Sequence, residues 1–256
     1  MAKDSSFWVF FLLIFLLSIP FWVIGSTELP LPIRLPASAF IFVNPALAAL
    51  FLSYRQYGSI GPRELLQKAV DYRVIKNKLW YIPIFLLTPS IYFLSYIILR
   101  LASLPLPDAI EIRFDLLPVF SLMFFVSGLL EELGWSGYAI EPMQNRWGVL
   151  KASIILGAVW QIWHIVGDVQ LHHAAIWIMW HSLYSIGLRV LIVWIYNNTG
   201  KSILAATLIH ATDNISWALF PNYGSHYDPF ITCIITIALT AVVIFLWNPG
   251  MLTQDK

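Results

Sequence analysis

Three groups of polar residues interrupt apolar stretches of this sequence, and their side chains suit hydrolytic chemistry. The first is a pair of adjacent carboxylates, Glu131 and Glu132. The second is His164, and the third places His210 four residues before Asn214. An ionisable side chain inside a membrane segment is costly and marks a functional site by default. Together the three groups predict one buried active site.

The residue types in these groups have complementary roles. A carboxylate can take a proton from water, and an amide can donate a hydrogen bond to a developing oxyanion. Residues four apart share one face of a helix, so Asn214 lies beside His210 and Trp160 lies beside His164. An amide therefore accompanies one imidazole, and an indole accompanies the other.

Glu131 and Glu132 cannot have the same role. Successive residues are about 100° apart around a helix, so only one of the two carboxylates can point fully into a shared cavity. For hydrolysis, two mechanisms are open. With a metal ion, Glu131, His164 and His210 would resemble the three protein ligands of catalytic zinc, which leave one position for water. Without a metal ion, Glu131 would act as the general base, and the imidazoles would position the water.

The composition is that of a membrane protein. Hydrophobic residues make up 59% of the 256 residues and charged residues 11%, far below the roughly 25% of a soluble domain. The formal net charge of +1 gives no reason to expect nucleic acid as a partner. The single cysteine, Cys233, excludes an intrachain disulfide and a cysteine-built metal site.

The hydrophobic pattern predicts an all-α polytopic fold, with residues 1–256 forming a single membrane domain. About 20 apolar residues are needed for each transmembrane helix. On this basis we expect eight spans, over residues 7–24, 35–53, 79–99, 116–133, 149–166, 174–196, 202–220 and 229–247.

The basic residues predict the orientation of the spans. The segment between the second and third spans contains Arg55, Arg63, Lys68, Arg73, Lys76 and Lys78. The next loop, residues 102–115, carries Asp108, Glu111 and Asp115 against Arg113. Because basic loops stay on the cytoplasmic side, both termini should be cytoplasmic and the polar site should open toward that side. We expect the bilayer to be a bacterial cytoplasmic membrane.

Helical rise places the polar residues at a similar depth. At 1.5 Å per residue, Glu131 lies roughly 15 Å inside its cytoplasmic end, His210 roughly 14 Å and His164 roughly 20 Å. Asn214 lies one turn beyond His210. This agreement predicts one shared cavity.

The three groups also resemble a known family. Their order and spacing are similar to the EExxxR, aromatic-xxx-His and HxxxN blocks of the CPBP (Abi) intramembrane proteases, which include the type II CAAX prenyl endopeptidases. In this sequence the blocks fall on Glu131 and Glu132, on Trp160 and His164, and on His210 and Asn214. The resemblance covers about residues 116–216. It implies an eight-helix intramembrane endopeptidase with its catalytic core in that segment.

One position departs from the family pattern. The arginine of the first block falls on Ser136, four residues after Glu132. Glu132 must then be protonated, bonded to the Ser136 hydroxyl or paired from elsewhere. We expect Arg189, roughly 10 Å inside its own span, to take the place of the missing arginine.

Other residues near the blocks have secondary parts in this prediction. Trp135 and Trp160 are the two tryptophans expected to support the site, whereas the others suit the membrane interface or packing. Asp213 ranks behind Asn214 as the polar partner of His210. His181 is expected to be a hydrogen-bonded core residue outside the site.

These observations predict an endopeptidase that cleaves a membrane-associated peptide or protein through water activated by Glu131. Relatives of this kind act on prenylated C-termini or process peptides such as bacteriocins. Two alternatives stay open. One is a catalytically silent member that binds a membrane partner or regulates it. The other is a transporter that uses the buried carboxylates and histidines as a proton relay.

Overall fold

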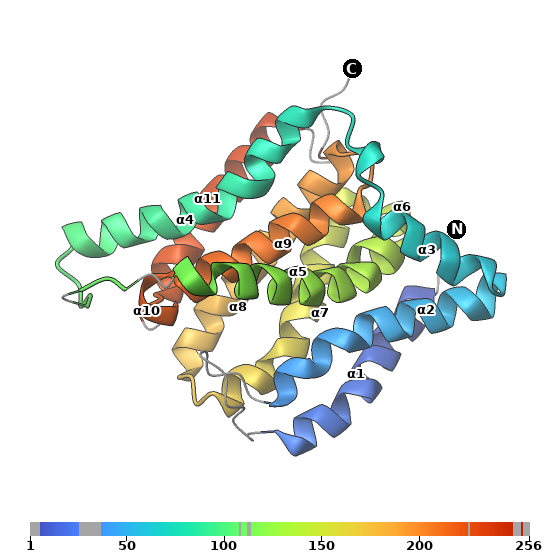
Figure 1. The fold of residues 1–256 in the computed structure, drawn as a ribbon, viewed down its shortest axis with the longest axis horizontal. Coiled ribbons are helices and arrows are strands. Elements are labelled where there is room, and N and C mark those ends of the chain that lie inside the picture. The colour runs from blue at the N-terminus through green and yellow to red at the C-terminus, as the bar shows by residue number, and fades with distance from the viewer. Residues whose placement is uncertain are drawn as a thin grey trace.

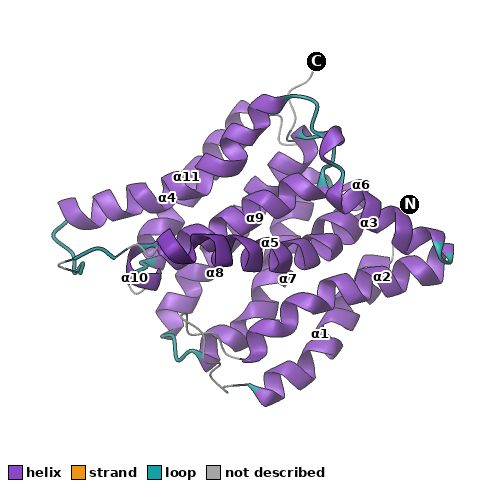
Figure 2. Ribbon diagram, in the orientation of Figure 1, coloured by secondary structure: helices purple, strands orange, loops and turns teal. Residues whose placement is uncertain are grey.

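The computed structural model describes residues 6–25, 37–107, 109–111, 114–224, 226–247 and 252. Within them every regular element is helical, as Figure 2 shows, which confirms the predicted all-α class. The first five and last four residues, on which the predicted cytoplasmic termini depend, lie outside the described part, as do Asp108 and Arg113.

Six helical segments of the described chain are long and apolar enough to cross a membrane. The protein is therefore a polytopic membrane protein. The segments contain α1 (Ser6–Ile24), α4 (Tyr81–Leu101), α5 (Leu117–Gly134) continued by the π-helix η5 (Trp135–Ala139) and α6 (Ile140–Trp147), α7 (Val149–Gln170), α8 (Ala175–Asn198) and α11 (Pro229–Leu246).

The other two of the eight predicted spans correspond to shorter helices. α2 (Val43–Tyr57) has 15 residues because the preceding segment, η1 (Ala37–Phe42), is a 3-10 helix. α9 (Ile203–Leu219) has 17 residues. It begins where the Ser202 hydroxyl caps the Ala205 amide at 3.1 Å, and it ends before Pro221, which disfavours helix at the residue before it. Length thus supports six spans, and the number eight stays a prediction.

The short elements lie between these helices. In the basic segment lies α3 (Ile60–Val70), which buries Gly61, Leu65 and Ala69 on one face. The remaining elements are η2 (Tyr72–Val74), η3 (Lys78–Trp80), η4 (Phe114–Leu116) and α10 (Pro221–Gly224).

The long helices surround a central group of four. α5 packs beside α9, and α7 packs beside α8, with contacts between α8 and α9 joining the two pairs. Figure 1 shows α1 and α2 on one flank of this group and α4 and α11 on the other. The buried core is largest around α7 and α8, where Trp163 donates a hydrogen bond to Ser18 of α1 at 2.7 Å. The central group therefore holds the three polar blocks together.

A glycine allows α7 and α8 to approach closely. A Cβ atom on Gly157 would lie 3.0 Å from Ile186 Cα and 3.1 Å from Arg189 Cβ, so a larger side chain there would push the helices apart. Gly167, ten residues later on α7, has no described atom within 4 Å of such a Cβ.

Gly157→Val should lower the free energy of unfolding by about 1–3 kcal/mol through overpacking. Gly167→Val, the matched change in open space, should leave stability near that of the wild type. Thermal unfolding of the purified proteins in detergent, followed by tryptophan fluorescence, measures both. Equal melting temperatures for the two variants would contradict this account of the α7–α8 contact.

Candidate active site

The adjacent glutamates lie where α5 changes into a π-helix. Glu131 and Glu132 occupy the last turn of α5, and the five-residue π-helix η5 follows directly. Single π-helical turns inside α-helices often occur at functional sites. Here the wider turn still keeps residues four apart in contact: Trp135 reaches back to Glu131, and Ser136 reaches back to Glu132.

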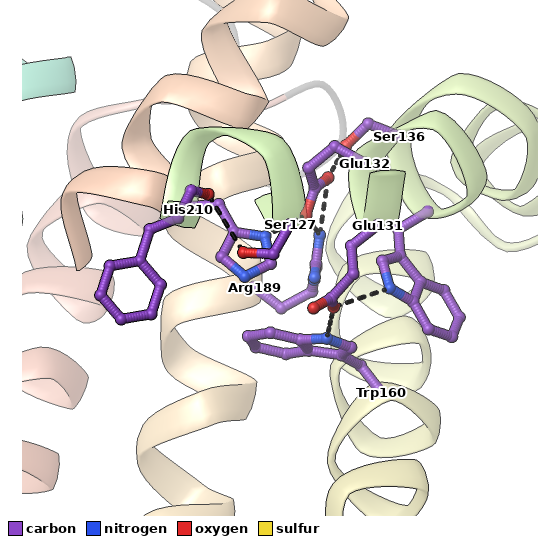
Figure 3. A network of polar contacts seen from close by, with 9 residues as sticks. Ser127, Glu131, Glu132, Ser136, Trp160, Arg189 and His210 are labelled. Atoms are coloured by element: carbon purple, nitrogen blue, oxygen red, sulfur yellow. Dashed lines mark hydrogen bonds and ion pairs between the residues drawn. The ribbon is translucent and has the colours of Figure 1, made fainter. Parts of the chain in front are cut away.

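Two indoles hold the Glu131 carboxylate. Its Oε2 atom accepts a hydrogen bond from Trp160 Nε1 at 2.8 Å and another from Trp135 Nε1 at 3.3 Å. Figure 3 shows Trp160 directly beside the Glu131 carboxylate, and Glu131 is 5% exposed. Both tryptophans therefore contact the site as predicted. Neutral donors orient this carboxylate without adding a positive charge.

Glu132 has a different set of partners. Arg189 Nη1 lies 2.8 Å from its Oε1 and 3.0 Å from its Oε2, and the Ser136 hydroxyl donates to Oε2. His210 Nδ1 lies 2.9 Å from Oε1. Arg189 thus contacts Glu132, and Ser136 contributes as well; that Arg189 replaces the missing family arginine stays a prediction. The two glutamates point to different neighbours.

Arg189 also connects the two carboxylate networks. Its side chain and that of Glu132 are fully buried, so both charges have left water. The guanidinium lies 4.3 Å from the ring centroid of Trp160, whose indole nitrogen holds Glu131. A cation over an indole face is stabilised electrostatically. Arg189 thus neutralises one glutamate and supports the residue that orients the other.

The hydrogen bonds of His164 and His210 define the tautomer of each imidazole ring. His164 Nδ1 lies 2.9 Å from the backbone oxygen of Trp160, and His210 Nδ1 bonds to the Glu132 carboxylate. A carbonyl and a carboxylate only accept, so we assign a hydrogen to each Nδ1. Nε2 of each neutral ring is then left as an acceptor.

The predicted residues meet in one cavity of about 130 Å³. Its lining includes Glu131, His164, His210 and Asn214, which confirms the predicted shared cavity. Glu132 is not among the described residues that line it. The catalytic roles of Glu131, Glu132, His164, His210 and Asn214 stay predictions. The full lining comprises Glu131, Trp160, Gln161, His164, His181, Tyr184, Ser185, Leu188, His210, Asp213 and Asn214.

Several lining residues were not expected from the sequence. His181, which we expected outside the site, lines the cavity, and its Nδ1 lies 3.2 Å from the Tyr227 hydroxyl. Tyr184 also lines it and donates to Asp213. Gln161 is the one that spacing could have identified, because it precedes His164 by three residues and shares its helix face.

The arrangement does not fit the zinc site that one of the two open mechanisms would need. In the described chain, no group of three or more His, Cys, Asp or Glu side chains is placed to hold a metal ion. Glu131, His164 and His210 share the cavity but not a common coordination point. No step of the chemistry below is derived through a metal.

Comparison with known proteins identifies the segment that holds the cavity. The family model "Type II CAAX prenyl endopeptidase Rce1-like" matches residues 113–216. Residues 113–216 are thus similar to this family. CAAX prenyl protease 2 of Methanococcus maripaludis is 36% identical over 90 residues, which are 32% of this chain and 31% of that protein. The chain thus matches about a third of the length of this curated relative.

The matched family model confirms the resemblance drawn from the three blocks. Each block lies inside the Rce1-like segment, from Glu131 in the first to Asn214 in the third. Arg189, the compensating cation, lies in the same segment. The Rce1-like segment therefore contains both the cavity residues of the blocks and the ion pair beside them.

Arg189→Gln should destabilise the protein by about 3–5 kcal/mol, because it leaves Glu132 buried without its cation. Arg100→Gln, at an exposed position near the end of α4, is the control. The double variant Glu132→Gln/Arg189→Gln should lose less stability than the two single losses added together. Thermal unfolding in detergent measures each. An unchanged melting temperature for Arg189→Gln would show that the ion pair is not needed for the fold.

Proposed function

We propose that this protein is a multi-pass membrane endopeptidase that hydrolyses a peptide bond of a membrane-associated protein or peptide. The observation that carries the proposal is the shared cavity, which brings one carboxylate, two imidazoles and one amide together inside a membrane protein. The similarity of residues 113–216 to an endopeptidase family supports the reaction class. The cavity residues supply the groups that such a reaction needs.

In the proposed mechanism, Glu131 takes a proton from a water molecule in the cavity. The water oxygen attacks the carbonyl carbon of the scissile bond, and the carbonyl oxygen becomes an oxyanion. Asn214 donates a hydrogen bond to that oxyanion. The carbon–nitrogen bond then breaks as Glu131 returns the proton to the leaving amine. Water has two hydrogens, so the second is donated to Nε2 of one histidine, His164 or His210, which orients the water oxygen toward the carbonyl carbon.

Glu132 acts through His210 in this mechanism. Its carboxylate accepts from His210 Nδ1 at 2.9 Å, which fixes the tautomer and leaves Nε2 toward the reaction. Arg189 balances the charge of Glu132, so a second uncompensated carboxylate does not lie beside Glu131. The catalytic part expected for Glu132 is therefore that of a positioning residue.

The substrate proposal follows from the location of the cavity and the family. The matched relative is named a CAAX prenyl protease, so prenylated proteins are one candidate class and bacteriocin-like peptides another. We place the protein in a bacterial cytoplasmic membrane with both termini in the cytoplasm. In this arrangement α2 and α9 would complete eight crossings.

Glu131→Gln should abolish cleavage, because a carboxamide cannot take the proton from water. Protein and peptide termini are compared quantitatively in membranes of cells that carry the wild type or the variant at matched expression. Glu111→Gln, a change of the same kind at an exposed loop residue, is the control. Termini that disappear only with Glu131→Gln would identify substrate and cleavage site together.

The opposite result would favour a non-catalytic protein. If Glu131→Gln leaves all termini unchanged and still complements a deletion, proteolysis is not the function. Ser185→Trp then separates the alternatives, since Ser185 is a buried residue of the cavity lining and a large side chain there would fill the site. Loss of the phenotype with this variant alone would indicate a binding or regulatory cavity.

Asn214→Ala should lower the rate of cleavage by about 10²-fold, the usual effect of removing one oxyanion donor. Thr212→Ala, on the same helix outside the cavity lining, should leave the rate near that of the wild type. Turnover of the substrate found above is measured with purified proteins. Equal rates for Asn214→Ala and the wild type would remove Asn214 from the mechanism.

A further inference from the structure

Gly167 is a helix glycine that neither packing nor backbone conformation explains. Glycines elsewhere in the long helices stand at close contacts: a Cβ on Gly157 would lie 3.0 Å from the α8 backbone, and one on Gly187 would lie 3.2 Å from Thr236. A Cβ on Gly167 would have no described atom within 4 Å. Glycine inside a helix costs about 1 kcal/mol relative to alanine. Here it borders open space.

The open space beside Gly167 lies next to polar residues that line the catalytic cavity. His164 lies three residues before Gly167, so the two share a face of α7. Gln161, deeper on that helix, is buried, whereas α7 is partly exposed continuously from His164 to Asp168. From His164 to Gln170 every residue of α7 is at least partly exposed, so exposure extends from a cavity residue to the end of the helix.

Two polar side chains of α7, Gln161 and Asp168, lie along this part of the helix. Gln161 lines the cavity, and its Nε2 donates to Asp168 Oδ2 at 3.0 Å. Asp168 is a carboxylate within a membrane-spanning helix that the proposed mechanism does not use. Such a group is costly in an apolar setting and usually faces a water-filled space. The hydrogen bond thus connects the cavity to a side chain that requires hydration.

On α8 and in the loop before it, imidazole and indole rings extend from the cavity in the same direction. His181 lines the cavity and stacks on Trp177, with ring centroids 4.8 Å apart. Trp177 stacks on His173 at 3.7 Å, and His173 lies in the loop before α8. Polar groups of both helices therefore extend from the cavity to the loop of residues 171–174.

This loop lies at the end of α7 remote from the basic segment. Glu141 of α6, just before α7, lines one pocket with Lys68 and Lys201, so α7 begins at the basic end of the molecule. Its 22 residues extend roughly 33 Å to Gln170. His164 is six residues from that far end. His164 is thus nearer to the surface opposite the basic end than to the basic end itself.

We infer that Gly167 and Asp168 keep open a path by which water enters the catalytic cavity from the loop of residues 171–174. The inference rests on the proposed hydrolytic function, because hydrolysis consumes a water molecule at each turnover. It places the aqueous opening opposite the basic segment, whereas the sequence led us to expect an opening on the basic side. Gly167 supplies the space, and Asp168 and Gln161 supply the polar lining.

Cysteine accessibility tests the path without relying on catalysis. In a Cys233→Ser background, Ser185→Cys places a single thiol in the cavity wall. A membrane-impermeant, positively charged thiosulfonate is added to one face of oriented vesicles. Ala174→Cys marks the face that carries the loop, and Gln67→Cys marks the face that carries the basic segment, since both positions are exposed. Gly167→Trp then fills the opening, and Gly167→Ala is its matched control.

The expected result is labelling of Ser185→Cys from the Ala174 face. Gly167→Trp should slow it roughly tenfold or more, because a charged reagent would have to cross apolar surroundings, and Gly167→Ala should not. Labelling from the Gln67 face alone, no labelling from either face, or an unchanged rate with Gly167→Trp would overturn the inference. Accessibility is read without substrate. If the wild-type protein proves not to be a protease, the labelling result still holds. The two proposals can therefore fail separately.

Discussion

The buried ion pair between Glu132 and Arg189 is the interaction on which the rest of the site depends. Both side chains are fully buried, so each charge requires the other. The pair joins α5 to α8, and through His210 it reaches α9. Breaking such a pair leaves an uncompensated charge in an apolar interior, which is far more costly than the net gain from forming the pair. The packing of three helices and the orientation of one imidazole are thus coupled to a single electrostatic contact.

This contact lets two adjacent, chemically identical residues have different functions. Glu132 has a cation, a hydroxyl and an imidazole as partners, whereas Glu131 accepts from two indoles and lines the cavity. A carboxylate held by neutral donors keeps its capacity to take a proton from water, and one paired with arginine does not serve that purpose as well. The π-helix after Gly134 keeps Trp135 within reach of Glu131 and Ser136 within reach of Glu132.

The sequence predicted more of the site than of the fold's details. Spacing and depth placed Glu131, His164, His210 and Asn214 in one cavity, because helical rise and positive-inside placement act over long segments. The compensating cation was found by the same reasoning, since Glu132 at this depth requires a partner. The lengths of α2 and α9 and the place of His181 could not be predicted in this way. They depend on a 3-10 turn, a serine cap and the rotation of α8, which local pattern does not fix.

A parallel measurement of Glu131→Gln and Glu132→Gln tests the central claim most directly. For each variant, the thermal midpoint in detergent and the rate of substrate cleavage are determined on the same preparation. Glu131→Gln should melt close to the wild type and have no activity, because a carboxamide oxygen still accepts from both indoles. Glu132→Gln should melt well below the wild type, because Arg189 loses its counter-charge. If Glu132→Gln is as stable as the wild type, or if the two variants lose stability equally, the assignment of Glu131 to catalysis and of Glu132 to the structure is wrong.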